Sequence, residues 1–442
     1  MTDRHHHRDH HDASLDRTMV DEFASRALAV RRVDDAVRAE TDPWLEAVSR
    51  GFLDGERNDT QRQAFFAGSA YRRKIGVFDE TAPQAEVPVA TFASWAAELT
   101  VPGGTVPACA ISSVTVAPTH RRRGILRSLM TGELRTAVER GLPLAILTVS
   151  ESTIYGRFGF APAALAAHWT IDARRARWVG PAAPEAPGRI DFVSRQQGRE
   201  IAAALHERTR LGAPGEIDMP GGHWDRFFGT RPDIEKAEQL RVVQYRSTAG
   251  EVDGVAVYRV TENENDFTAS TVDVVLLVAA TDEAYAALWH FLLTMDLIAT
   301  VRASELSVDE PLWWMIADQR AATVTLRDHH YTRILDVPVA LSARTYDVAD
   351  TLVLDVADPL GIAAGTFLLT TDADGTAAVD IVDEPPVGVP VVRLGVAELS
   401  AILLGGVSPV TLARAGRLVA DDAARVARLF ASTVPPRLSF WY

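Results

Sequence analysis

The chain has 442 residues, of which 47% are hydrophobic, and its formal net charge is −14. This length suggests about three domains, and the hydrophobic fraction is enough for several cores. The negative charge argues against a nucleic-acid partner, because such binding depends on neutralising phosphates. It suits the attraction of a polycationic substrate, although an acidic surface also serves solubility alone.

Other classes are excluded by the absence of their signals. No hydrophobic run reaches the ~18 residues that a membrane helix needs, and the N-terminus lacks the apolar core of a signal peptide. The single cysteine, Cys109, rules out an internal disulfide framework. We therefore expect a cytoplasmic protein with no membrane partner.

The first 20 residues include the run HHHRDHH and offer little to bury, so they predict a disordered tail. Clustered histidines can bind zinc or nickel, but no further ligand lies nearby, and no metal site is predicted. Beyond this tail, strand-like runs are expected at residues 27–33, 74–78, 89–99 and 109–116.

The stretch from 111 to 130 carries the strongest functional signal. A β-branched run covers residues 111–116, and Pro118 then interrupts the strand because proline has no backbone N–H. Three arginines lead into Gly124, after which hydrophobic residues recur at helical spacing over residues 125–138. The sequence thus predicts a strand, a basic turn and a helix in direct succession.

The start of this helix has the properties of an anion site. The first N–H groups of a helix lack intrahelical partners, and the helix dipole adds partial positive charge there. Gly124 allows a ligand to approach the backbone closely. These features suit a pyrophosphate, although a basic turn capped by glycine, with no ligand, would have the same composition.

The order Val-x-Val, proline and Arg-x-x-Gly-x-Leu resembles the acetyl-CoA motif of the GCN5-related N-acetyltransferases (GNAT). Residues 143–160, PLAILTVSESTIYGRFGF, resemble the second half of the site in the Eis (enhanced intracellular survival) family. Members of that family are actinobacterial acetyltransferases that act on several amines of aminoglycosides. Both motifs occur in the family's order and spacing, and the resemblance extends weakly over nearly the whole chain.

The resemblance implies that acetyl-CoA is a substrate and assigns residues to it. The predicted contacts come from the end of the first strand, the basic turn and the end of the neighbouring strand: Val114, Thr115, Val116, Arg121, Arg122, Arg123, Gly124, Ile125, Leu126, Arg127, Ser150 and Glu151. Tyr155 would be the proton donor to the leaving thiolate, because a phenol with a pKa near 10 is protonated at neutral pH. A core tyrosine beside Phe158 and Phe160 is the alternative.

The family also implies that the carboxylate of the last residue is the proton acceptor. In this chain that residue is Tyr442, where the family usually has phenylalanine. The carboxylate belongs to the backbone, so the role survives this difference. Two further aromatic residues, Phe440 and Trp441, precede it, which favours docking of the terminus over exposure to water.

Three prolines in residues 178–188 predict a stiff linker at the end of the first domain. The strand and helix order then repeats, but the helix after the strand at 272–279 begins Thr-Asp-Glu and lacks the Arg-x-x-Gly turn. Carboxylates in a first turn complement the helix dipole and would repel a pyrophosphate. The second domain is therefore expected to be a degenerate copy without cofactor. His329 and His330 are expected in a loop with ordinary hydrogen bonds.

The predicted architecture is α/β (α+β), with two tandem GNAT-like domains followed by a sterol-carrier-like domain. The expected ranges are a His-rich tail (1–20), an active GNAT domain (21–178), a degenerate GNAT-like domain (188–340) and a sterol-carrier-like domain (343–442) that supplies the terminal carboxylate. The last of these resembles a lipid carrier, yet in this family it closes the active site and builds the oligomer, which is implied to be a homohexamer.

The predicted activity is acetyl-CoA-dependent acetylation of amines on a small polycationic acceptor, an aminoglycoside. Two alternatives stay open at this point. One is acetylation of protein lysines, and the other is a non-enzymatic acyl-CoA or lipid sensor.

Overall fold

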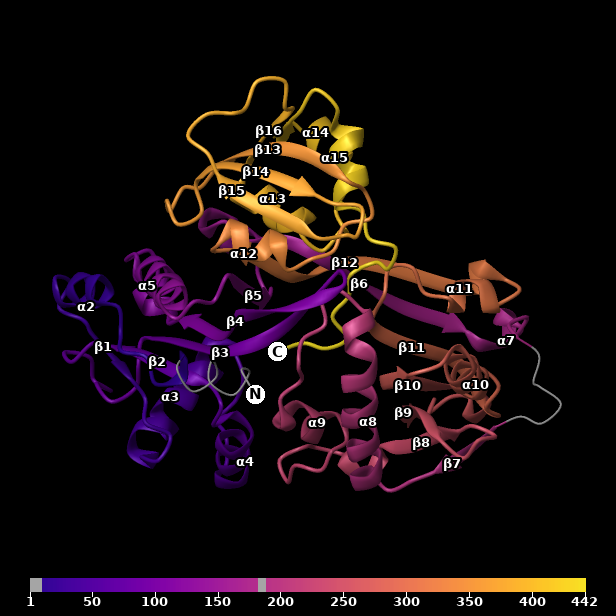
Figure 1. The fold of residues 1–442 in the computed structure, drawn as a ribbon. Coiled ribbons are helices and arrows are strands. Elements are labelled where there is room, and N and C mark those ends of the chain that lie inside the picture. Colours follow the sequence, from indigo (N-terminus) through magenta and orange to yellow (C-terminus); the bar gives the residue numbers. More distant parts are fainter. Residues whose placement is uncertain (1–9, 182–187) are drawn as a thin grey trace. The chain divides into compact units, whose positions relative to one another are not determined.

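The computed structural model describes residues 10–181 and 188–442. These residues belong to two compact units (Figure 1). Unit 1 contains the chain up to Ala164, residues 330–433 and Tyr442, and unit 2 contains residues 165–329 and 434–441. The histidines at positions 5–7 and most of the proline-rich linker lie outside the described residues.

The predicted disordered tail is wrong for residues 10–20. Helix α2 (Arg17–Ala24) begins inside this range, where the Asp16 side chain accepts a hydrogen bond from the Met19 N–H at 2.7 Å and caps the helix. Met19 and Phe23 are fully buried in the core of unit 1. His10 is buried as well, with Nε2 2.9 Å from Ser94 Oγ. Polar composition misled the prediction because two apolar side chains one helical turn apart are enough to anchor this segment.

A mixed sheet forms the first part of unit 1. Its strands lie in the order β1-β2-β3-β4-β5-β12, and neighbours are antiparallel except for β4 and β5, which are parallel. The strands are β1 (Ala29–Arg32), β2 (Arg73–Phe78), β3 (Ala90–Val101), β4 (Gly104–Val116), β5 (Leu144–Thr148) and the end of β12 (Ala322–Ile334). The main helices are α3 (Arg38–Gly51), α4 (Asp59–Ser69) and α5 (Ile125–Glu139).

A parallel pair needs a crossover connection, and α5 provides it between β4 and β5. Its inward face carries Leu129, Met130 and Leu134, which are completely buried with Ile111 of β4 and Leu147 of β5. This packing holds the first turn of α5 at the carboxyl end of β4.

The C-terminal part of unit 1 has a sheet of its own, in the order β15-β14-β13-β16-β17 (Figure 1). Its strands are β13 (Asp350–Ala357), β14 (Gly365–Thr371), β15 (Ala377–Ile381), β16 (Val391–Gly395) and β17 (Leu418–Val419). The accompanying helices are α12 (Val337–Ser342), α13 (Val396–Ile402), α14 (Pro409–Arg414) and α15 (Ala423–Phe430).

Unit 2 repeats the mixed-sheet pattern with strands in the order β6-β11-β10-β9-β8-β7, and β10 and β11 are its parallel pair. The strands are β6 (Ala161–Asp172), β7 (Arg189–Phe192), β8 (Arg241–Arg246), β9 (Val252–Thr261), β10 (Ser270–Ala279) and β11 (Ile298–Leu306). The helices are α7 (Ala173–Ala176), α8 (Arg195–Thr209), α9 (Gly221–Phe227), α10 (Asp282–Leu293) and α11 (Leu312–Met315).

Two features differ from the sequence-based expectations. The division between the units falls after Ala164, inside β6, and not at residues 178–188, because β6 pairs with β11 from Thr300↔Asp172 onward. His329 and His330 do not lie in a loop: both are buried within β12. Among the described residues, no helix is both long enough and apolar enough to cross a membrane.

Candidate active site

Strands β4 and β5 run side by side and then separate. Their parallel register extends from Ala108↔Leu144 to Ile111↔Leu147. Beyond this point β4 stays paired with β3 as far as Val116. Where parallel strands part, main-chain N–H and C=O groups on their facing edges become available to a ligand. The facing edges of β4 and β5 are therefore no longer paired with each other at their carboxyl ends, and this separation is called the opening between β4 and β5.

The three strand residues predicted to contact acetyl-CoA line the end of β4. The register of β4 against β3 shifts between Ser112 and Thr115, and Ser113 has a φ of 52°, which is the geometry of a bulge that redirects the end of the strand. Thr115 is buried, with Oγ1 2.7 Å from Thr91 Oγ1. Val114 and Val116 are half-buried. Beyond the bulge, the edge of β4 that faces β5 is short and unpaired with β5, and a thioester arm can follow it.

The basic turn follows at once. Arg121, Arg122 and Arg123 are exposed, and Gly124 occupies the N-cap position of α5 with a φ of 75° and no side-chain cap. A Cβ at Gly124 would lie 3.2 Å from Nη1 of Arg26, so glycine suits both the backbone conformation and the space. Ile125 is buried, Leu126 half-buried and Arg127 exposed. Uncapped N–H groups and exposed guanidinium groups thus meet at one helix end, as an anion site requires.

Tyr155 lies beyond the end of β5 in the short helix α6 (Ser152–Tyr155). Its ring packs edge to face against Phe160 at 6.1 Å between centroids, and the side chain is 9% exposed. Burial, together with the negative charge of Glu151, raises the pKa of Tyr155 to about 12. The phenol is therefore protonated at neutral pH. Ser150 and Glu151 are both exposed at this strand end.

The last residue of the chain is also in unit 1. Thr148, at the end of β5, donates from Oγ1 to the terminal oxygen of Tyr442 at 2.7 Å. The Tyr442 side chain is buried, with its ring 5.2 Å from that of Trp95 and its hydroxyl 3.0 Å from His330 Nε2. Thr148, which holds the chain terminus, precedes Tyr155 by seven residues, so both belong to the end of β5 and the short helix that follows it.

Sequence reasoning missed the residues that hold this terminus. Thr148 places a hydroxyl at the last position of a buried strand, and this is the one local sign of the contact that the sequence contains. Trp95 and His330 gave no such signal, because the sequence separates each of them from Tyr442 by more than a hundred residues. His330 had been expected in a loop and instead contacts Tyr442 from within β12.

Comparisons with known proteins agree with this geometry. Three family models match: an acetyltransferase (GNAT) domain over residues 32–163, a second acetyltransferase (GNAT) domain over residues 215–334 and a sterol carrier protein domain over residues 337–439. An uncharacterized N-acetyltransferase of Streptomyces avermitilis is 40% identical over 393 residues, which cover 86% of this chain and 90% of that protein.

The relatives with a family name decide the assignment. N-acetyltransferase Eis of Mycobacterium tuberculosis is 33% identical over 356 residues, which cover 77% of this chain and 83% of Eis. The solved structure of Eis1 from Mycobacterium abscessus superposes with a TM-score of 0.77 at 30% identity and covers 94% of this chain and 100% of that one. The chain belongs to the Eis family of GCN5-related N-acetyltransferases.

Membership in the Eis family settles the broad questions. The fold is two GNAT domains followed by a sterol-carrier-type domain, as the sequence predicted. The chain is an N-acetyltransferase, which removes the non-enzymatic sensor from the alternatives. GNAT domains imply acetyl-CoA as the acyl donor. Within the described ranges, no three His, Cys, Asp or Glu side chains are grouped so that they could hold a metal ion.

Proposed function

We propose that this enzyme transfers the acetyl group of acetyl-CoA to primary amines of a polycationic acceptor of the aminoglycoside type. One observation carries the proposal. Thr148 at the end of β5 donates a hydrogen bond to the chain terminus, and the same end of β5 is followed by the short helix that contains Tyr155. A carboxylate and a phenol at one site supply the two proton-transfer groups that amide formation from an ammonium requires.

Binding of acetyl-CoA is assigned to the opening between β4 and β5. The pyrophosphate would lie at the first turn of α5, where the arginine side chains and the backbone N–H groups around Gly124 neutralise its charge. The pantetheine arm would follow the edge of β4 at Val114 and Val116. An N–H of this edge that donates to the thioester carbonyl would stabilise the developing oxyanion by about 3 kcal/mol.

The terminal carboxylate of Tyr442 is assigned as the base. An acceptor amine enters as an ammonium, loses a proton to the carboxylate and attacks the thioester carbon. The C–S bond then breaks, the CoA sulfur leaves as a thiolate and the nitrogen loses its second proton to water. Tyr155, whose pKa is raised to about 12, is still protonated at this stage and donates its hydrogen to the sulfur. The Tyr155 phenolate then regains a proton from water and the carboxylic acid of Tyr442 releases its own, so both groups are restored and one proton in total is released for each amide formed.

An aminoglycoside acceptor is favoured by the charge balance. The chain carries 59 acidic and 45 Lys or Arg residues, and such an excess of negative charge draws a polycation from a distance. An anionic base in the site attracts the same cation at close range. Acetylation of protein lysines, whose amine is also cationic, is the second candidate.

An acceptor panel tests the proposal. Release of CoA is followed with a thiol reagent for an aminoglycoside with several primary amines, for a lysine-containing peptide and without acceptor. Cys109 will not interfere, because burial raises the pKa of its thiol. We expect CoA release with the aminoglycoside, and products that carry added acetyl groups in a mass spectrum. Acetylation of the peptide alone would contradict the aminoglycoside assignment. The homohexamer that the resemblance implies is tested separately by light scattering. A hexamer would give six times the mass of one chain.

A further inference from the structure

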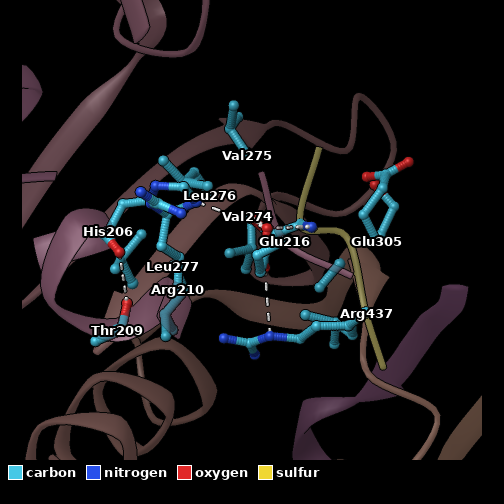
Figure 2. Close-up of a pocket in the computed structure, with 15 residues that line it drawn as sticks. His206, Thr209, Arg210, Glu216, Val274, Val275, Leu276, Leu277, Glu305 and Arg437 are labelled. Atoms are coloured by element: carbon cyan, nitrogen blue, oxygen red, sulfur yellow. Dashed lines mark hydrogen bonds and ion pairs between the residues drawn. The ribbon is translucent and has the colours of Figure 1, made fainter. Parts of the chain in front are cut away.

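The second GNAT domain retains a separated strand pair, and this opening contains part of the chain itself. Strands β10 and β11 are parallel from Ser270↔Ile298 to Val274↔Ala303. Beyond Val274, β10 stays paired with β9 as far as Ala279, while β11 stays paired with β6 as far as Leu306. The opening between them is lined by residues 274–278 and 303–306 and also by Arg437 and Ser439 (Figure 2).

Little free space is left in this opening. The remaining cavity has a volume of about 40 Å³, which is room for a few water molecules at most and not for a pantetheine arm. Its wall combines apolar residues of β10 with four polar side chains, which are His206, Thr209, Arg210 and Glu216 (Figure 2). Through Arg437 and Ser439, the segment Val434–Trp441 thus occupies the opening that corresponds to the proposed acetyl-CoA site between β4 and β5.

The segment is held by hydrogen bonds along its length. The Arg437 N–H donates to the Pro214 carbonyl at 2.8 Å. Gly215, which has a φ of 94°, is necessary for this approach, because a Cβ there would lie 2.6 Å from the Arg437 carbonyl oxygen. Farther along, the Phe440 carbonyl accepts from His329 Nε2 at 3.2 Å, and the Trp441 carbonyl accepts from Arg226 Nη2 at 2.8 Å.

Glu216 is the centre of this anchorage. Its side chain is 2% exposed, and its carboxylate accepts from the Ser439 N–H at 3.3 Å and from Ser439 Oγ at 3.2 Å. Nε of Arg437 lies 3.4 Å from Oε1, and His206 Nε2 lies 3.6 Å from Oε2. Burial raises the pKa of Glu216, but His206 and Arg437 more than offset it, and the pKa lies below its usual value. A buried ionised group with four such contacts fixes geometry more than it adds stability.

We propose that the cofactor opening of the second GNAT domain has become a socket for the segment Val434–Trp441, and that Glu216 is the positioning residue that holds the terminal carboxylate in register. Tyr442 follows Trp441 by one peptide bond, so a segment fixed at Ser439, Phe440 and Trp441 restricts where the carboxylate can lie. This inference rests on the proposed function, in which that carboxylate is the base.

The proposal is tested with Glu216→Gln in the full-length chain. This variant keeps the size of the side chain but removes the charge that binds Arg437 and His206. Glu305→Gln is the matched control, since Glu305 is a carboxylate on the wall of the same cavity. A third variant, Arg437→Met, changes the segment itself and leaves the body of unit 2 untouched, which keeps the test valid if Glu216→Gln does not fold.

Two measurements are made on each variant. The first is the rate at which a carboxypeptidase releases Tyr442, followed by mass spectrometry. We expect release to be at least ~10-fold faster in Glu216→Gln and Arg437→Met than in the wild type and in Glu305→Gln. The second is steady-state kinetics, where kcat should fall by roughly 10-fold or more because small misplacements of a reacting group are costly. KM for acetyl-CoA should stay the same. General damage to the fold, in contrast, would change this KM as well.

The outcomes separate this inference from the proposed function. Unchanged release of Tyr442 would overturn the socket, and faster release with normal kcat would overturn the positioning role. A chain extended by one glycine after Tyr442 serves as the reference for the base. If that extension is harmless, the proposed base fails. If it is damaging while Glu216→Gln is harmless, only the socket fails.

Discussion

The two GNAT domains offer an internal comparison, because one chain contains the same strand pattern twice. In the first, β4 and β5 part after Ile111↔Leu147, and in the second, β10 and β11 part after Val274↔Ala303. In both, the strand before the crossover helix has a register shift against its antiparallel neighbour just beyond that point. Strand geometry alone therefore does not distinguish a cofactor site from a vestigial one.

The difference lies in the residues that start the crossover helix. α5 begins after three exposed arginines at Gly124, with no side chain capping its N–H groups. The N-cap of α10 is Thr281, whose side chain accepts from the Ala284 N–H at 3.2 Å, and Asp282 and Glu283 lie in the first turn. The first helix end is open and positive, and the second is capped and negative. These few residues are the reason why the proposed pyrophosphate site is assigned to the first helix end and not to the second.

The largest expected effect comes from placing a carboxylate at the first of these helix ends. Gly124→Asp puts a side chain at a φ of 75° and a negative charge where the pyrophosphate would lie. We expect acetyl-CoA binding to disappear in calorimetry, while the wild type binds one molecule per chain. Asp282→Asn, at the equivalent end of α10, is the matched control and should bind normally. Residual binding in folded Gly124→Asp would falsify the comparison, because the second opening would then also take the cofactor.

The next effect concerns the chain terminus. One added glycine keeps every side chain but moves the terminal charge by ~3.5 Å, away from the hydroxyl of Thr148. We expect kcat to fall by roughly 10³-fold, within the range for loss of a general base, with unchanged affinity for acetyl-CoA. Tyr442→Phe is the control: it loses the hydroxyl next to His330 but keeps the carboxylate, so its turnover should stay close to that of the wild type. Normal turnover of the extended chain would mean that another group accepts the proton.

A smaller effect is expected at Tyr155. Tyr155→Phe keeps the ring that packs on Phe160 and removes the hydroxyl, so thermal stability should change little. Turnover should fall by about 10²-fold, the scale of a general acid, because the thiolate then leaves without a proton. The control is the variant Tyr258→Phe, which removes the hydroxyl of a tyrosine buried in the core of unit 2. This variant should turn over like the wild type. If both variants turn over normally, Tyr155 is a core residue like Tyr258.

The elements of the proposed acetyl-CoA site were predictable because their signals are local. A proline after a β-branched run, three arginines, a glycine and a helical period lie within twenty residues, and the structure has β4, the turn and α5 in that order. Capping and acidic residues at the start of α10 were equally readable. Each of these signals depends on neighbours in the sequence.

The rest depends on partners that are distant in the chain. His330 is a polar residue that a sequence places in a loop, yet it is buried in β12 and bonded to Tyr442, 112 residues away. His10 is also buried, and its ring forms a hydrogen bond with the side chain of Ser94, which is 84 residues away. Likewise, Glu216 gives no local sign that it will hold Ser439. Burial of a polar group is possible only when its partner is present, and the sequence does not say which partner that is.

The last prediction concerns the protonation of Tyr155 and involves no change in activity. Burial and the charge of Glu151 raise the pKa of Tyr155 to about 12, above the ~10 of an unfolded tyrosine. Folding therefore favours the neutral phenol, and this contribution to stability is fully present below pH ~10 and is lost as the pH rises toward 12. The difference in phenolate absorbance between the wild type and Tyr155→Phe isolates this residue from other buried tyrosines. We expect no difference below pH ~10. An earlier titration would show that Tyr155 is ionised too readily to serve as the acid.

A raised pKa does not by itself mark an acid, because the pKa of Tyr285 in unit 2 is raised as well, by burial and by Glu310. What sets Tyr155 apart is its position beyond the strand end where the chain terminates.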